Sequence, residues 1–249
     1  MVLEVIPRNP KTAGFLPKTT LILDTSFRGL KAVAFSLGTC RRLGLGMIGP
    51  NGAGKTTLLK TISGLLRPSK GKVILDDEDI TSLPPHRLVR KGLVLAQEGR
   101  HIFQGMSVRE NLMLGAYSTT WDKWDGWHQS ILEVFKPLKE KLDREAITLS
   151  GGEQQMLNIA RALFSKPKIL LLDEPSIGLS PKVTSQMLES LKLFRDMAQI
   201  SVLLSEQNPY VILNLCERVY ILEEGRIVFG GGTRDVLNLE DIAGSYLGK

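Results

Sequence analysis

Residues 49–57 form a glycine-rich stretch whose residue types suit the binding of phosphate groups. The stretch reads Gly49-Pro50-Asn51-Gly52-Ala53-Gly54-Lys55-Thr56-Thr57 and fits the pattern G-x-x-x-x-G-K-[ST]. Glycines here let backbone N–H groups converge on phosphate oxygens that side chains would otherwise block. In such a loop Lys55 would reach the β- and γ-phosphates, and the Thr56 hydroxyl would ligate Mg²⁺. A chance glycine turn is the alternative, and a strand before the loop and a helix after it argue against that.

A second chemical group is the acidic pair Asp173-Glu174, which directly follows the apolar run 169–172. A carboxylate at the carboxyl end of a buried parallel strand lies where α/β folds bind ligands. Asp173 would hold Mg²⁺ through water, and Glu174 would polarise the attacking water. Alone, such a pair is common in surface turns. Together with the phosphate loop, it predicts hydrolysis of a nucleotide.

The third group is the segment LSGGEQQ, residues 149–155, which includes Ser150, Gly151, Gly152 and Glu153. Its serine and two glycines would place a hydroxyl and free amides at a helix N-terminus, which is a second anion site. One nucleotide does not need two γ-phosphate cradles. We therefore expect this cradle to close on a nucleotide held by another subunit, although a bare capping turn is the simpler alternative.

The elements that must position these groups alternate between strands and helices. Strands are expected at residues 21–23 (an edge strand), 43–48, 72–75, 93–96, 169–172, 200–204 and 219–222. Helices are expected at residues 55–66, 84–91, from 107 with a capping box, 152–164 and 181–197. This order predicts a parallel sheet flanked by helices and interrupted by a helical insertion at about residues 99–160.

The helical insertion holds the three tryptophans, Trp121, Trp124 and Trp127, which are separated by Asp and Lys. This spacing predicts tryptophans that are half-exposed or packed on a partner. Packing in the core of the chain is the default alternative.

The composition limits the classes of partner. Hydrophobic residues make up 43% of the chain and charged residues 23%, as in ordinary folded proteins. The net charge is +6, from 32 Lys and Arg against 26 Asp and Glu, with no long basic run. We expect a mildly basic, solvated surface, with docking near a membrane as the second interpretation and nucleic acid a distant third. The 6% of aromatic residues gives little support to base stacking.

Two cysteines, Cys40 and Cys216, lack metal-ligand spacing, so we expect structural thiols in a reduced, cytosolic protein. The first residues include Glu4, Pro7 and Arg8 and lack an apolar segment, so no signal peptide is expected. No window approaches the roughly 20 apolar residues that cross a bilayer. Any attachment to a membrane is therefore expected to go through a partner.

The motifs GPNGAGKTT, LSGGEQQ and LLLDEP, in this order and spacing, resemble the nucleotide-binding subunits of the ABC transporter superfamily over about residues 20–249. The resemblance implies an α/β P-loop NTPase fold: a RecA-like parallel sheet core with an inserted α-helical subdomain and a small N-terminal antiparallel β part. It implies a tail at 1–18 and a nucleotide-binding domain at 19–249. Within that domain the core would take about 19–98 and 161–249, and the helical subdomain about 99–160.

The same resemblance implies an ATPase that binds ATP and Mg²⁺ and releases ADP and phosphate. In that superfamily the LSGGEQ signature completes the ATP site of a partner in a head-to-tail dimer. Coupling helices of the membrane subunits dock on the helical subdomain.

Finer matches resemble the ATPases of branched-chain amino-acid importers, of the kind that pairs with a second, non-identical ATPase. They are TISGLLRPSKGKVILDDEDITSLPPHR, the stretch 98–103, and LSEQN followed by CERVYILEEGRIV. The resemblance implies two permease subunits, an indirect link to a solute-binding protein, and no nucleic acid. It implies a cytoplasmic subunit held on the inner face of the membrane by the permeases. The amino-acid substrate follows from the resemblance alone.

Three positions depart from the pattern of the superfamily. Gln207 replaces the histidine that contacts the γ-phosphate, and because glutamine cannot become cationic, slower hydrolysis at this site is a hypothesis. The residue that senses Mg²⁺ is either Gln97 or Glu98. Ser180 replaces the aspartate expected after the acidic pair.

The N-terminal fifth matches least well. Phe27 is the best candidate for stacking on adenine, and residues 34–46 are rich in Gly and Arg. Divergence or a locally shifted reading frame would explain that segment. Two other functions remain as alternatives: a soluble ABC ATPase acting on nucleic acid or the ribosome, and a regulatory nucleotide-binding subunit with weak hydrolysis.

Overall fold

The computed structural model describes residues 21–27, 30–33, 36–37, 43–118 and 124–237. The expected tail at 1–18, Cys40 and Trp121 lie outside this part. Cys216 is a buried free thiol, and burial raises its pKa.

The sheet is built from strands that alternate with helices, as the sequence predicts. Their bounds are β1 (Leu21–Phe27), β2 (Leu30–Val33), β3 (Ser36–Leu37), β4 (Gly44–Ile48), β5 (Lys70–Leu75), β6 (Glu78–Asp79), β7 (Leu93–Ala96), β8 (Ile169–Asp173), β9 (Ser201–Glu206), β10 (Arg218–Glu223) and β11 (Arg226–Gly232). The order across the sheet is β6-β5-β1-β2-β11-β10-β4-β9-β8-β7, with β3 paired to β1. The run from β10 to β7 is parallel, and antiparallel pairing links β5, β1 and β2.

The expectation of an edge strand at residues 21–23 is wrong. β1 is flanked by β5 on one side and β2 on the other, so it lies inside the antiparallel part. A short apolar run is compatible with either place, because edge position depends on pairing with distant strands.

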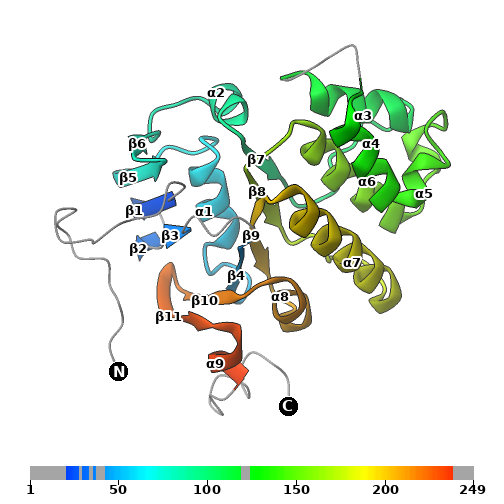
Figure 1. The fold of residues 1–249 in the computed structure, drawn as a ribbon. Coiled ribbons are helices and arrows are strands. Elements are labelled where there is room, and N and C mark those ends of the chain that lie inside the picture. The colour runs from blue at the N-terminus through cyan, green and yellow to red at the C-terminus, as the bar shows by residue number, and fades with distance from the viewer. Residues whose placement is uncertain (1–20, 28–29, 34–35, 38–42, 119–123, 238–249) are drawn as a thin grey trace.

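The helices cover both faces of the sheet (Figure 1). Their bounds are α1 (Lys55–Ile62), α2 (Pro85–Arg90), α3 (Val108–Ala116), α4 (Gly126–Val134), α5 (Lys136–Lys139), α6 (Gly151–Phe164), α7 (Pro181–Ala198), α8 (Pro209–Leu215) and α9 (Thr233–Leu237), with a 3₁₀ turn η2 (Ala146–Thr148). The green helices α3 to α6 gather at one side of the sheet in Figure 1, where the sequence predicts the inserted subdomain.

The helix expected at residues 55–66 is shorter in the structure. α1 ends at Ile62, with Ser63 as C-cap, and Gly64 then adopts a left-handed φ of 73°. A glycine just past the last turn ends a helix at little conformational cost. By contrast, the capping box at Ser107 and Glu110, which opens α3, is confirmed.

Two hydrophobic clusters lie on opposite faces of the parallel strands. In β8, Ile169 and Leu171 belong to the cluster that contains α1, whereas Leu170 and Leu172 belong to the cluster that contains α6 and α7. Every residue of β4, β8 and β9 is buried, as expected for strands covered on both faces.

The tryptophans of the helical insertion pack within the chain. Trp124 lies edge-on to Phe164, and Trp127 edge-on to Phe194, with ring centroids 5.3 and 5.2 Å apart. The indole N–H of Trp127 donates to the Leu163 carbonyl at 2.9 Å. Both residues are partly buried and pack against the core of the chain, so the predicted half-exposed placement holds together with packing inside the chain.

Candidate functional site

The register of the parallel strands brings the predicted groups together. Ile48, the last residue of β4, pairs with Glu206, and Asp173 at the end of β8 pairs with Ser205. The phosphate loop, the acidic pair and Gln207 therefore follow neighbouring strands at one edge of the sheet. This is the edge at which open α/β folds bind ligands.

Glycine is required at several points of the loop that joins β4 to α1. Gly52 and Gly54 adopt left-handed φ values of 80° and 105°, which other residues rarely take. A Cβ on Gly49 would lie 2.2 Å from the Leu222 carbonyl oxygen. Gly54 caps α1 without a side-chain hydrogen bond, and the first turn of α1 holds no acidic residue. The positive end of the helix thus stays available for an anion.

Lys55 is buried and bound within the loop. Its ammonium group donates to the carbonyls of Gly49 and Pro50 at 2.7 and 3.1 Å. It also forms an ion pair with Glu174 Oε1 at 3.1 Å, and both side chains are less than a tenth exposed. Glu174 has a left-handed φ of 44°, a cost that non-glycine residues carry mostly at functional sites.

Gln207 closes the same cluster from the end of β9. Its side-chain amide donates to Glu174 Oε2 and to Asn51 Oδ1, both at 2.7 Å. Glu174 therefore contacts both Lys55 and Gln207, as a shared site requires.

Asp173 and Thr56 provide the oxygens that a divalent cation would need. The Thr56 hydroxyl donates to Asp173 Oδ1 at 3.2 Å, and the Ser205 hydroxyl donates to the same atom at 2.6 Å. Asp173 Oδ2 is buried and accepts no hydrogen bond from the described residues. Such an orphaned carboxylate oxygen beside a hydroxyl fits Mg²⁺, which takes one or two protein ligands plus phosphates and waters. Sequence reasoning missed Ser205, whose one signal is a polar residue within an apolar strand.

A cavity of about 250 Å³ opens between these groups. It is lined by Asn51, Gly52, Gly54, Lys55, Thr56, Thr57, Glu98, Glu174, Ile177 and Gln207. Of the two candidate metal sensors, Glu98 lines the cavity. Gln97 does not, and its main-chain carbonyl accepts from Asn158 Nδ2 at 3.2 Å.

Beside the cavity, the buried carboxylate of Glu206 joins two loops. Its oxygens accept from the backbone N–H groups of Ser176 at 2.9 Å, Gln207 at 3.3 Å and Asn208 at 3.5 Å. Burial raises the pKa of Glu206, and the hydrogen bonds from Ser176 act in the opposite direction. Sequence reasoning did not single out this residue.

The signature segment does not line the cavity of its own chain. Ser150 caps α6 in a capping box: its backbone N–H donates to Glu153 Oε2 at 3.0 Å, and its hydroxyl accepts from Glu153 N at 3.4 Å. A Cβ on Gly151 would lie 2.8 Å from the Arg100 guanidinium, and one on Gly152 would lie 2.3 Å from Val183. Close packing against the branched Val183 side chain therefore requires glycine at Gly152, whereas at Gly151 the flexible Arg100 side chain could move aside.

The structure gives the place in the fold of two further predicted positions, Phe27 and Ser180, without testing their roles. Phe27 is the last residue of β1, and its side chain lies outside the described part, so its role at adenine stays a prediction. Ser180 is the N-cap residue of α7 and makes no capping hydrogen bond with its side chain.

A parallel sheet with a phosphate loop after one strand and an acidic pair after another defines a P-loop NTPase, here with helices inserted beside the core. The sequence matches the family model of the ABC transporter over residues 30–177. The chain belongs to this family, as an ATP-binding subunit with ATPase activity.

Several curated relatives cover most of the chain. The high-affinity branched-chain amino acid transport ATP-binding protein BraG of Pseudomonas aeruginosa is 42% identical over 202 residues, which is 81% of this chain and 86% of that protein. The probable branched-chain amino acid transport ATP-binding protein LivF of Archaeoglobus fulgidus is 38% identical, over 78% and 82%. The lipopolysaccharide export system ATP-binding protein LptB of Haemophilus influenzae is 34% identical, over 82% and 86%.

A solved structure supports the same fold. The ADP conformation of MJ1267, an ATP-binding cassette of an ABC transporter, superposes with a TM-score of 0.77 at 28% identity. The match covers 93% of this chain and 98% of that chain. Among the described residues, none of the helices combines the length and the hydropathy needed to span a bilayer.

Proposed function

We propose that this chain powers an importer of branched-chain amino acids, as one of two non-identical ATPases attached to two permease subunits. The observation that carries the proposal is its similarity to BraG and LivF, at 42% and 38% identity over about four fifths of the chain. Attachment to permeases would place the chain on the cytoplasmic face of the membrane, where it would act on a solute-binding protein only indirectly.

ATP would bind with its phosphates along the loop and the N-terminus of α1. Lys55, which the loop carbonyls and Glu174 hold in the structure, would turn to the β- and γ-phosphates. Thr56 and Asp173 would hold Mg²⁺, with Glu98 lining the same cavity. The bound Mg²⁺ would neutralise phosphate charge during transfer of the γ-phosphoryl group to water.

Glu174 would accept the proton of the attacking water once Lys55 has left it for the phosphates. Gln207 donates to Glu174 in the structure and would orient that carboxylate while contacting the γ-phosphate. Because its amide stays neutral, Gln207 would stabilise the developing charge less than a histidinium does.

The exposed Ser150 at the start of α6 would contact the γ-phosphate held by the second ATPase. Ser150 is exposed and does not line the cavity of its own chain, which supports a role at the nucleotide of the other subunit. The site built on Lys55 would in turn be completed by the signature segment of that second subunit.

A groove between β7, α3 and α6 supports docking of a permease segment. It has a volume of about 430 Å³ and is lined on one side by Phe103 and Tyr117, which are 51% and 74% exposed. Arg161 lines the same groove, and its buried Nη1 has no hydrogen-bond partner among the described residues. The exposed aromatic side chains at this groove suit the apolar face of a docking helix, and the buried Nη1 is not accessible to it.

Similarity to LptB at 34% identity favours lipopolysaccharide export as the second candidate function. The deciding experiment has two parts. The gene for this chain is deleted and uptake of labelled leucine is measured. Separately, the chain is purified from membranes and the proteins that co-purify with it are identified. Loss of uptake, restored by the wild-type chain, together with two permeases and a second ATPase, would support the importer. Unchanged uptake with lipopolysaccharide-export partners would contradict it, and recovery with DNA or ribosomes would favour a soluble ABC ATPase.

A further inference from the structure

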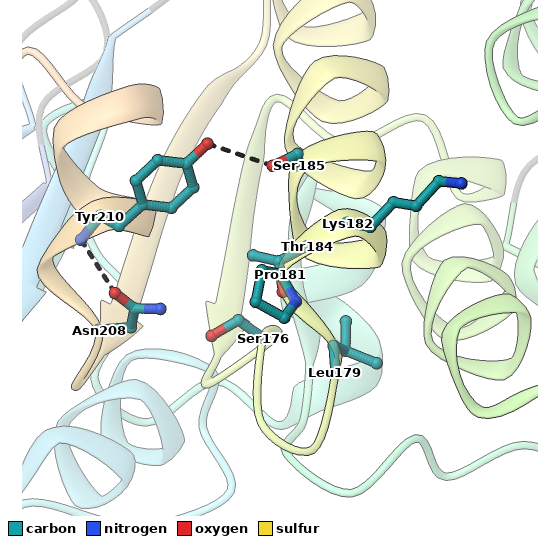
Figure 2. Close-up of a pocket in the computed structure, with 8 residues that line it drawn as sticks. All are labelled: Ser176, Leu179, Pro181, Lys182, Thr184, Ser185, Asn208 and Tyr210. Carbon is teal, nitrogen blue, oxygen red and sulfur yellow. Dashed lines mark hydrogen bonds between the residues drawn. The ribbon is translucent and has the colours of Figure 1, made fainter.

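A second cavity lies beyond the phosphate site, between the N-terminus of α7 and the start of α8. Its volume is about 470 Å³, and it shares no lining residue with the phosphate cavity. It is lined by Ser176, Leu179, Pro181, Lys182, Thr184, Ser185, Asn208 and Tyr210, as Figure 2 shows. These residues are mostly hydroxyl or amide side chains, and none of them is acidic.

The helix that opens on this cavity has an uncapped positive end. α7 is 18 residues long, Ser180 makes no capping hydrogen bond with its side chain, and the first turn holds no acidic residue. Pro181 has no N–H, so the first free backbone donors belong to Lys182 and Val183. The end of such a helix attracts negative charge.

Thr184 supplies an independent indication of a ligand. Its side chain lines the cavity, and the residue is only 4% exposed. Within the part of the chain that the structure describes, its hydroxyl has no hydrogen-bond partner, while its backbone N–H donates to the Ser180 carbonyl. A hydroxyl that lines a cavity and has no protein partner is available to donate to an acceptor in that cavity.

Asn208 faces Thr184 across the cavity. Its Oδ1 accepts from the Tyr210 backbone N–H at 3.0 Å. Its Nδ2 group lies on the other side of the side-chain amide, toward Pro181 in Figure 2. Tyr210 and Ser185 pair their hydroxyls at 3.2 Å across the rim. Lys182 extends away from Tyr210 in Figure 2, so it adds long-range attraction for an anion and no direct contact.

We propose that this cavity binds a small oxyanion, a carboxylate or a phosphate, through Thr184, Asn208 and the free N–H groups of α7. A carboxylate would come from a small acid or an acidic side chain of a bound protein. A phosphate would come from solution. Both need the same convergent donors, and the proposal does not depend on the importer function or on the transported substrate.

The test follows backbone amides by NMR while the full chain is titrated with sodium phosphate and, separately, with sodium acetate at matched ionic strength. A Lys55→Ala background silences phosphate binding at the loop, and the wild-type chain saturated with ADP serves as a second background. We expect saturable shifts at Lys182, Val183 and Thr184 with phosphate, acetate or both. The anion that saturates identifies the source.

The variants test the named donors. Thr184→Val is expected to weaken binding roughly tenfold, the effect of one hydrogen bond to a charged group, whereas Thr184→Ser is expected to retain it. Asn208→Leu is expected to weaken binding as well and is informative if Thr184→Val does not fold. Ser190→Ala, which removes a hydroxyl lower on α7 that donates to Val134, is expected to bind as before. Linear shifts equal to those with chloride, or unchanged affinity in both Thr184→Val and Asn208→Leu, would overturn the proposal.

Discussion

At the scale of single residues, the contact between Glu174 and Lys55 leads to the first prediction. Glu174→Gln is expected to lower ATP hydrolysis by about 10²- to 10⁴-fold, because an amide cannot accept the proton of the attacking water. ATP binding is expected to persist and to trap a closed dimer. Steady-state phosphate release and retention of labelled ATP measure the two effects, and near-normal turnover would remove Glu174 from the role of base.

Gln207 lies within hydrogen-bond distance of Glu174, so its chemistry can be tested by replacing it with the residue usual in the superfamily. Gln207→His is expected to raise the ATPase rate of the assembled pair by up to about tenfold, the value of one charge-assisted hydrogen bond in the transition state. Unchanged activity of the pair would count against the hypothesis that glutamine slows this site. Gln207→Ala provides the comparison in which both hydrogen bonds are lost.

Glu206 predicts a pH dependence of stability. Burial raises its pKa above the ordinary value of 4.5, so its contribution to stability is full below that value and is lost as pH rises through the raised pKa. Glu206→Gln removes the ionisation and keeps one oxygen as an acceptor. We expect the free energy of unfolding of the variant to gain on that of the wild type as the pH rises above 4.5. Urea denaturation across that range measures the difference, and a constant difference would contradict the assignment.

At the scale of elements, the crossing of α3 and α6 depends on a glycine. A Cβ on Gly115 would lie 2.0 Å from the Arg161 carbonyl oxygen, which is backbone and cannot swing away. Gly115→Ala is therefore expected to push the helices apart and to cost about 1–3 kcal/mol in the free energy of unfolding. Gly126→Ala is the matched control, because a Cβ there has no heavy atom within 4 Å. Equal denaturation midpoints for the two variants would show that the packing is looser than the structure indicates.

The elements also show which parts of the fold are predictable from sequence. Fully buried strands such as β8 and capped helices such as α3 are encoded by local patterns, and both were predicted close to their observed places. The position of β1 inside the sheet was not predictable, because it depends on pairing with β5 and β2. Loop geometry decides a similar question in the site: Glu98 lines the cavity and Gln97 does not, which residue types do not reveal, and the metal role of either residue stays a prediction.

For the site, the motifs predicted the residues with distinctive chemistry, and the structure added the residues that hold them. Lys55 and Glu174 were expected from their types and spacing, and Gln207 from the resemblance to the superfamily; Glu174 contacts both of the others. Ser205 and Glu206 were not expected, because a single polar residue at the end of a buried strand has no characteristic spacing. Their roles depend on the register between β8, β9 and β4.

At the scale of the whole molecule, the separation of the signature segment from the phosphate cavity predicts a functional asymmetry. Ser150→Ala is expected to reduce hydrolysis at the site whose phosphate loop belongs to the second ATPase, while ATP still binds at Lys55. Lys55→Ala is expected to abolish ATP binding at its own site and to leave the signature surface intact. Labelling of each subunit by a photoreactive ATP analogue measures ATP binding at each site, and the ATPase rate of the assembled pair measures hydrolysis. The two measurements together separate the two effects.

Ser107→Ala is the matched control for Ser150→Ala. Ser107 and Glu110 form the same capping box on α3 that Ser150 and Glu153 form on α6, so both substitutions remove a cap worth about 1 kcal/mol. If Ser107→Ala lowers turnover as much as Ser150→Ala does, the effect belongs to helix stability rather than to contact with the nucleotide.

The ion pair between Lys55 and Glu174 makes nucleotide binding a competition between two anions for one ammonium group. The γ-phosphate must displace the Glu174 carboxylate from Lys55, so we expect the affinity for ATP to be lower than the loop alone would provide. Neutralising Glu174 removes the internal competitor. Tight ATP binding by Glu174→Gln would then have two sources: blocked turnover and release of Lys55 from its ion pair. ADP has no γ-phosphate and is not hydrolysed. Its affinity therefore measures the release of Lys55 alone.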